Sequence, residues 1–456
     1  MLNNENSGTV FLVHCVDTEG PLYESPLATI ETFVATHGVD EGTAEKLMHS
    51  HSDPNLDPGL TERWRDHMSR RNYNADWHAV DNMLQELMSD EWREKYLDDA
   101  GCGYVFSWFV LDHVGFEINP RRRALGYHVV YDHYLEWLSR MPDTRDRLYW
   151  HFHPVSWSRE AHKSACTLSS SLEHLQILCR RVIDRNDFPV AFRPGQHTER
   201  SDLNLFLEQW IPFDYGSQSG PERPEDAAQR DISGGRFGDW RRAPQEWGFY
   251  HPSIWDYQLP GNLHRYVVRC LNLDSRLRPI TVEEMKSAFI QAENGRDTIM
   301  AITNHDQRDM RPGIEWLMTE INKMRAEFPR VTFLHANAVE AIRSVAAISA
   351  EPPLAFEASV DSERAVLDVR SGVNVWGNQP FLAIRQGHEY LHENFDRRGE
   401  NHWSFTFDHI TIPLERVDTI GVAAHSLSGD TTVITLNRAK NWESTVTHKN
   451  VGDWMS

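Results

Sequence analysis

Short apolar runs rich in β-branched and aromatic residues recur along the first three quarters of the chain, each bounded by polar or turn-forming residues. Runs of this length and composition are typical of buried strands. The pattern predicts strands at Thr9–Asp17, Tyr104–Asp112, Arg147–His153, Pro189–Arg193, Phe213–Ser217, Thr298–Asn304 and Val331–His335.

Helical patterns lie between several of these strands. Ser158–Asp184 carries leucines along one stripe, Arg311–Phe328 repeats apolar residues on one face, and Asp76–Tyr96 is a further helical region. Strands that alternate with helices predict a parallel sheet with the helices outside it, as in α/β barrels. The first part of the chain is therefore expected to have an α/β fold.

The pattern changes after about residue 350. Alternating apolar and polar residues at 373–376, 403–407 and 433–436 are separated by turn signals, one of them at 428–430. Short alternating strands joined by such turns are typical of antiparallel sheets. This part predicts a small C-terminal antiparallel β-domain of the sandwich type.

These patterns divide the chain into two domains and a tail. Residues 1–348 form the predicted α/β domain, with irregular insertions at about 22–100 and 219–262. We expect the first insertion to cover the cleft and the second to lie over the same mouth. Residues 351–446 form the predicted β-sandwich-like domain, and residues 447–456 form the tail.

Polar side chains gather where the predicted strands end. Because parallel strands of a barrel bring their carboxyl ends to one face, where barrel enzymes carry their chemistry, these side chains are expected to lie close together. The residues concerned are Asp17, Glu19, Asp112, His113, His151, His153, Arg193, Asn304 and His305.

Two pairs in this set have the spacing of neighbours on one face of a strand. His151 and His153 alternate, as do Asp17 and Glu19, so each pair projects to one side. A histidine pair by itself is more often a hydrogen-bonded pair at a sheet edge. The accompanying carboxylates favour a divalent metal, because a catalytic zinc site uses three such ligands and keeps one position for water.

The order of four short motifs resembles the NodB-homology polysaccharide deacetylases, and more narrowly their WbmS-like branch. The motifs are Val-Asp-Thr-Glu-Gly-Pro at 16–21, Trp-His-Phe-His-Pro at 150–154, Phe-Arg-Pro-Gly at 192–195 and Ile-Thr-Asn-His-Asp at 302–306. The resemblance covers roughly residues 8–345 apart from the insertions. It implies a distorted (β/α) barrel of about seven strands that uses a divalent metal, zinc being the expected one, to remove acyl groups from amino sugars.

The resemblance also assigns roles to individual residues. Asp17 matches the catalytic base, Arg193 the arginine that holds its carboxylate, and His305 the histidine that protonates the leaving amine. It further implies that Asp306 is the neighbour that tunes this late histidine. The three positions that match metal ligands are Glu19, His151 and His153.

The spacing of both pairs departs from the family, whose pattern has adjacent aspartates and histidines four residues apart. Two alternatives therefore stay open: Asp17 is the ligand and Glu19 the base, or the barrel is an inactive relative. His113, at a strand end, is weighed as a residue that lines the pocket against an ordinary turn histidine. His197, four residues after Arg193, is weighed as a contact to the substrate against a helix-start position.

Charge and cysteine usage narrow the class of partner and the compartment. A formal net charge of −21 excludes the basic footprint that nucleic acids require, and disfavours an anionic membrane surface. Five scattered cysteines without a CxxC pair, and an N-terminus unlike a signal peptide, favour the cytoplasm without membrane insertion. We expect a glycan or amino-sugar partner, and self-association through the C-terminal β-domain.

The sequence thus predicts a metal-dependent hydrolase that removes an N-acyl group from an amino sugar of a polysaccharide or its precursor. The first alternative is a glycoside hydrolase that uses paired carboxylates such as Glu19 and Asp112. The second is a glycan-binding scaffold without catalysis.

Overall fold

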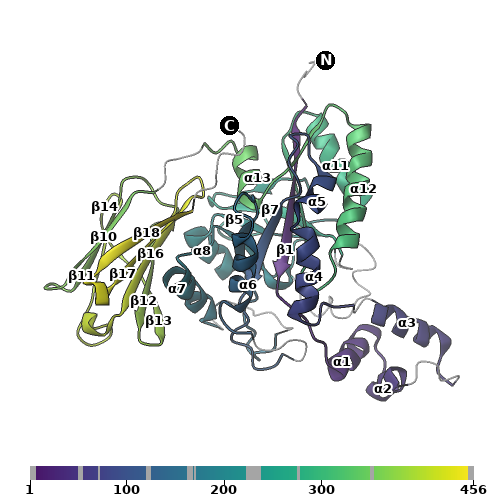
Figure 1. Cartoon of the computed structure of the whole chain (residues 1–456), viewed down its shortest axis with the longest axis horizontal. Coiled ribbons are helices and arrows are strands. Elements are labelled where there is room, and N and C mark those ends of the chain that lie inside the picture. The colour runs from purple at the N-terminus through teal and green to yellow at the C-terminus, as the bar shows by residue number, and fades with distance from the viewer. Residues whose placement is uncertain are drawn as a thin grey trace.

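The computed structural model describes residues 7–49, 55–69, 72–119, 125–161, 168, 171–221, 238–274, 278–349 and 354–449. Part of the predicted tail, 450–456, lies outside these ranges, as does much of the insertion predicted at 219–262. Figure 1 shows a helix-covered barrel beside a C-terminal part made of strands.

Seven parallel strands close into a barrel in the order β1-β2-β3-β4-β5-β7-β8, with β8 returning to β1. β8 pairs along nearly all of β1, whereas β2 pairs with the second half of β1 and the short strand β9 with the first half. Because β1 is shared in this way, the barrel is irregular. The predicted distorted (β/α) barrel of about seven strands is confirmed. The strands are β1 (Thr9–Thr18), β2 (Phe106–Leu111), β3 (Arg147–Phe152), β4 (Ala191–Pro194), β5 (Phe213–Ser217), β7 (Tyr266–Asn272), β8 (Thr298–His305) and β9 (Thr332–His335).

One barrel strand, β7, is missing from the sequence prediction. It lies between β5 and β8, and the two-residue strand β6 (Phe249–Tyr250) pairs with it in antiparallel direction. Without β7 the predicted strands could not close, because β5 and β8 have no direct pairing in the sheet.

Side chains alternate between the barrel axis and the helices outside. On β1, Phe11, Val13 and Cys15 join the interior cluster, and the next residue in this series is Asp17. The amino end of the barrel is closed by α13 (Ala338–Val345), whose residues belong to the same interior cluster. The carboxyl ends of the strands are therefore the end at which polar side chains can reach a ligand.

Amphipathic helices cover the outside of the barrel. Two of them differ from the predicted helices. Asp76–Tyr96 is divided, because Ser89 caps a new helix at the Trp92 amide. Of the predicted helix Ser158–Asp184, residues 162–167 and 169–170 lie outside the described ranges, Arg159 lies in a turn with a φ of 55°, and Glu173–Arg185 is helical. The covering helices are α4 (Trp77–Leu87), α5 (Asp90–Arg93), α6 (Val129–Ser139), α7 (Glu173–Arg185), α8 (Ser201–Trp210), α11 (Val282–Glu293) and α12 (Arg311–Glu327).

The insertion after β1 begins with a separate helical unit. Helices α1 (Pro26–His37), α2 (Glu41–His49) and α3 (Pro58–Ser69) enclose their own hydrophobic cluster, which shares no residue with the barrel clusters. The Leu22 amide donates to the Asn74 carbonyl at 3.0 Å, so the entry and exit of the unit lie side by side. Figure 1 shows the unit projecting from the body of the barrel.

The described part of the insertion predicted at 219–262 packs beside β7 on the outer wall of the barrel. Trp240, Ala243, Tyr250 and Tyr257 form a cluster with the outward-facing Val267 of β7. Burial of these apolar side chains holds the segment on the outer wall, and Trp240 Nε1 also donates to the His197 carbonyl in the turn after β4. That the insertion lies over the mouth stays a prediction.

The C-terminal part consists of two antiparallel sheets, as the alternating pattern predicts. The five-stranded sheet packs on α7, and the last strand runs to Lys449, past the predicted limit at 446. None of the helices in the described ranges is long and apolar enough to cross a membrane. The strands are β10 (Phe356–Asp361), β11 (Val366–Ser371), β15 (His402–Thr406) and β14 (Asp396–Gly399) in one sheet, and β13 (Glu389–Glu393), β12 (Phe381–Gln386), β16 (Thr419–His425), β17 (Thr431–Asn437) and β18 (Glu443–Lys449) in the other.

Candidate metal centre

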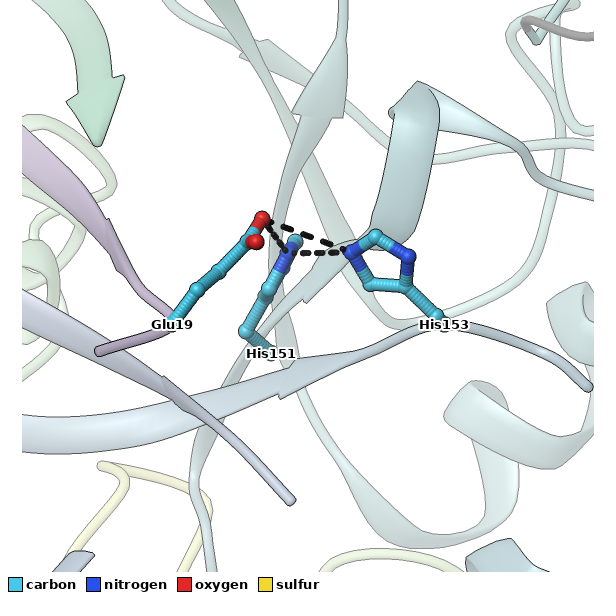
Figure 2. Close-up of side chains that lie close together, drawn as sticks. All are labelled: Glu19, His151 and His153. Atoms are coloured by element: carbon cyan, nitrogen blue, oxygen red, sulfur yellow. Dashed lines mark hydrogen bonds and ion pairs between the residues drawn. The ribbon is translucent and has the colours of Figure 1, made fainter. Parts of the chain in front are cut away.

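Glu19, His151 and His153 converge at the carboxyl end of the barrel, where Figure 2 shows their side chains pointing toward one another. The two Nε2 atoms of the histidines are 3.0 Å apart, and Glu19 Oε1 lies 3.7 Å from His151 Nε2 and 3.6 Å from His153 Nε2. In the described ranges of the chain, this is the single group of three or more His, Cys, Asp or Glu side chains close enough to share an ion.

The orientation of His151 is fixed by the neighbouring strand β4. Its Nδ1 lies 3.0 Å from the carbonyl oxygen of Arg193. Because a carbonyl only accepts, Nδ1 must carry the proton, which leaves a lone pair on the Nε2 that faces Glu19 and His153. A backbone acceptor behind a histidine is the usual way in which a protein orients a metal-binding imidazole.

His153 lies just beyond β3, and its position depends on a glycine in the turn after β4. A Cβ added at Gly195 would overlap the imidazole ring of His153. The motif Phe-Arg-Pro-Gly at 192–195 therefore contributes its arginine, its carbonyl and its glycine to the same site.

Replacing Gly195 by alanine is expected to displace the ring of His153 and weaken metal binding while the barrel stays folded. Loss of a contact that supports a metal ligand typically lowers metal affinity by about 10- to 100-fold, and the zinc affinity of Gly195→Ala should fall by at least this factor. Zinc titration against a competing chelator measures it, and Gly372→Ala, with open space around its Cβ and no left-handed φ, is the matched control. Wild-type zinc affinity in Gly195→Ala would contradict this positioning.

The turn that carries Glu19 is anchored by Asp306. Asp306 accepts hydrogen bonds from the backbone amides of Glu19 and Gly20, each at 2.9 Å, and from the hydroxyl of Tyr134 at 2.8 Å. His113 adds a further anchor, because its Nε2 donates to the Glu19 carbonyl at 2.7 Å. The expectation that Asp306 tunes its neighbour in sequence is thus corrected, since its carboxylate holds the end of the adjacent strand β1.

Asp17 and Arg193 form a buried bidentate ion pair beside the three candidate ligands. Arg193 Nε lies 2.6 Å from Asp17 Oδ1, and Nη2 lies 3.1 Å from Oδ2. Arg193 Nη1 also donates to the Tyr215 carbonyl and to the Cys270 thiol. Burial by itself would raise the pKa of Asp17, but the charge of Arg193, and then that of His151, hold this pKa well below its usual range. Asp17 is therefore an anion that is already engaged by its arginine.

His305 completes the group at the end of β8. Its Nε2 lies 3.7 Å from Asp17 Oδ2 and 3.9 Å from Glu19 Oε1. Burial lowers the pKa of His305, against the opposing effect of both carboxylates. With side chains 28% and 16% exposed, His305 and His153 are the members of the group that solvent reaches most.

The donor set fits a divalent first-row metal. Zinc binds histidine nitrogen and carboxylate oxygen at about 2.0–2.2 Å, so its ligand atoms lie roughly 3.3–3.6 Å apart in a tetrahedral site. The two distances from Glu19 are 3.6 and 3.7 Å, and the distance between the histidines is 3.0 Å. Two imidazole nitrogens and one carboxylate oxygen also leave a fourth position for water.

Some sequence-predicted residues lie elsewhere. The Asp112 carboxylate turns away from the barrel axis and binds Arg181 at 2.9 Å, with both side chains almost fully buried. Its pairing with Glu19 in a glycoside hydrolase site is therefore wrong. Tyr134 and Cys270 are not predicted from the sequence as residues of the site, because neither side chain belongs to a strand-end motif.

The fold and the cluster define a closed (β/α) barrel with a histidine–carboxylate centre at the carboxyl ends of its strands. No family model and no curated protein matches the chain. Two structures of an endo-β-1,4-mannanase from Cellulomonas fimi, 9% and 10% identical, align with 83% and 79% of this chain and with 71% and 70% of the mannanase, at TM-scores of 0.19 and 0.22. An expansin from Clavibacter michiganensis, 16% identical, aligns over 26% of this chain and 58% of its own, at a TM-score of 0.12. Likenesses this slight carry no argument about activity.

Proposed function

We propose that this protein is a metal-dependent hydrolase that removes an N-acyl group, acetyl in the simplest case, from an amino sugar. The observation that carries the proposal is the convergence of Glu19, His151 and His153 beside the Asp17–Arg193 pair at one end of the barrel. The motif order that resembles the NodB-homology deacetylases supports the same reaction and the glycan substrate.

The three converging side chains would hold a divalent metal, most simply zinc. Such an ion polarises the acyl carbonyl and acidifies a water molecule. The anchored turn at Glu19 and the carbonyl behind His151 fix two of the ligands before any ion arrives. Preformed ligands of this kind bind a metal without a further loss of side-chain freedom.

Asp17 and His305 would accept and donate the protons of the reaction. Asp17 is held as an anion by Arg193, and its Oδ2 faces His305 Nε2 at 3.7 Å. In the proposed reaction a water oxygen adds to the acyl carbon, and a carboxylate takes the water proton. His305 gives a proton to the amine nitrogen as the C–N bond breaks, so a free acid and a free amine leave the site.

The competing functions predict different products. A zinc-loaded sample incubated with an N-acetylglucosamine trimer and with UDP-N-acetylglucosamine is expected to release acetate without new reducing ends. Glu19→Gln, which keeps the side-chain volume and removes the charge, should lower this activity by at least roughly 100-fold. New reducing ends without acetate would overturn the proposal in favour of a glycosidase, and binding without either product would favour a scaffold.

A further inference from the structure

β4 and the turn after it contribute to the centre at every second residue. The carbonyl of Arg193 orients His151, and Gly195 gives the ring of His153 its space. His197 is the next residue in this series and ends the short 3-10 turn Gly195–His197. The charges of Arg193, Asp17, His305 and His151 act on its imidazole, which places His197 within the electrostatic reach of the centre.

Nδ1 of the His197 imidazole is buried without a hydrogen-bond partner in the part of the chain that the structure describes. The residue is 6% exposed, and no hydrogen bond from a described residue reaches its buried Nδ1. A buried polar nitrogen left in this state costs free energy, so its persistence calls for a partner from outside the protein.

The backbone around His197 is held in a conformation that it would not adopt by itself. Gln196 and His197 both have left-handed φ values, 54° and 51°. Such residues persist where the surroundings impose them, and they gather at ligand-binding sites. Trp240 Nε1 donates to the His197 carbonyl at 2.8 Å, and Gly238 lies so close to this carbonyl that an added Cβ would overlap it. Contacts to its carbonyl therefore fix this turn, while no described residue hydrogen-bonds to Nδ1 of its imidazole.

We propose that His197 is a substrate-binding residue whose imidazole hydrogen-bonds to a hydroxyl of the amino sugar beside the metal centre. This inference rests on the proposed function. A neutral imidazole offers one donor and one acceptor, which is the complement of a hydroxyl group. Burial, and then the charge of Arg193, hold the pKa of His197 well below its usual range, so the imidazole is neutral at pH 7.

The test compares His197→Leu and His197→Gln with the wild type in zinc-loaded protein. Leucine keeps a similar volume but cannot hydrogen-bond, whereas glutamine keeps a donor and an acceptor. We expect His197→Leu to raise KM for the N-acetylglucosamine trimer about tenfold, the effect of one hydrogen bond, with kcat changed much less. His197→Gln should stay within about threefold of the wild type, and zinc content and Tm should be unchanged in both.

Calorimetric binding of the glucosamine trimer, the deacylated product, separates this inference from the proposed function. His197→Leu should weaken this binding by the same factor as it raises KM, because the product keeps the hydroxyls. If all three proteins bind the glucosamine trimer with equal affinity, the role of His197 is overturned. It is also overturned if both variants lose the same factor in affinity together with zinc or with a lower Tm. If the wild type binds the glucosamine trimer but releases no acetate, the proposed function fails while the variants still decide the role of His197. If it binds neither trimer, both proposals are wrong.

Discussion

Replacing His151 by alanine is expected to abolish stoichiometric zinc binding and the release of acetate. The side chain is 1% exposed, and it joins Glu19 and His153 through one nitrogen and the Arg193 carbonyl through the other. Loss of a supporting partner of a ligand typically costs about 10- to 100-fold in metal affinity or activity, so loss of the ligand itself should cost more. Elemental analysis after zinc loading and dialysis, with acetate release assayed on the same samples, measures both effects.

The matched control is His388→Ala, because His388 is an exposed histidine in the turn between β12 and β13. It should keep wild-type zinc content and activity. Glu19→Gln should lose zinc binding and acetate release as His151→Ala does, since each substitution alters one of the three converging ligands. Stoichiometric zinc and wild-type activity in His151→Ala would show that the metal centre is wrongly assigned.

Replacing Arg193 by alanine is expected to destabilise the protein by about 3–5 kcal/mol, the usual effect of removing one partner of a buried ion pair. Arg193 is fully buried and binds Asp17 through two nitrogens, so the truncation leaves an uncompensated carboxylate inside the barrel. Denaturation by urea measures the free energy of unfolding. Arg140→Ala, at an exposed ion pair with Glu136, is the control and should change it by less than about 1 kcal/mol.

A double variant distinguishes the lost ion pair from lost packing. Arg193→Met and the double variant Asp17→Asn, Arg193→Met have the same side chain at position 193, and the double variant should be the more stable of the two, because it buries no unpaired charge. If Arg193→Ala were as stable as the wild type, the buried pair would not be formed in solution.

The same pair predicts how stability depends on pH. The folded-state pKa of Asp17 is held well below that of an exposed carboxyl by Arg193 and His151, which outweigh burial. Its contribution to stability is therefore complete above the pKa of an unfolded aspartate, about 3.9, and is lost as the pH falls toward the folded-state value. Below about pH 4, the unfolding free energy of the wild type should fall more steeply than that of the double variant Asp17→Asn, Arg193→Met. Parallel curves would contradict this assignment.

Hydrophobic patterning was sufficient to predict most of the barrel. Its strands are short runs buried on both faces, and six of the seven barrel strands appear among the predicted segments, some shifted by one or two residues at their ends. β7 (Tyr266–Asn272) has the same kind of sequence, with adjacent valines and a buried cysteine and leucine. It was missed because the irregular stretch before it obscured the strand–helix alternation.

The candidate site could be predicted only in part. The alternation of side chains along β1 and β3 was sufficient to predict that Glu19, His151 and His153 project toward one site. It could not show which carboxylate joins the histidines, because that depends on the side chain of Arg193 turning to Asp17. The anchoring of Glu19 by Asp306 spans almost the whole barrel in sequence, and no local pattern encodes such a contact.

Diffraction from zinc-loaded crystals at wavelengths on either side of the zinc absorption edge tests the metal centre most directly. We expect an anomalous peak bounded by Glu19 Oε1, His151 Nε2 and His153 Nε2, with each of the three atoms at about 2.0–2.2 Å from the ion. The metal centre, and the hydrolase proposed from it, would be contradicted if no peak lay between these side chains at saturating zinc. They would also be contradicted if other residues bound the zinc while Glu19, His151 and His153 kept their contacts to one another.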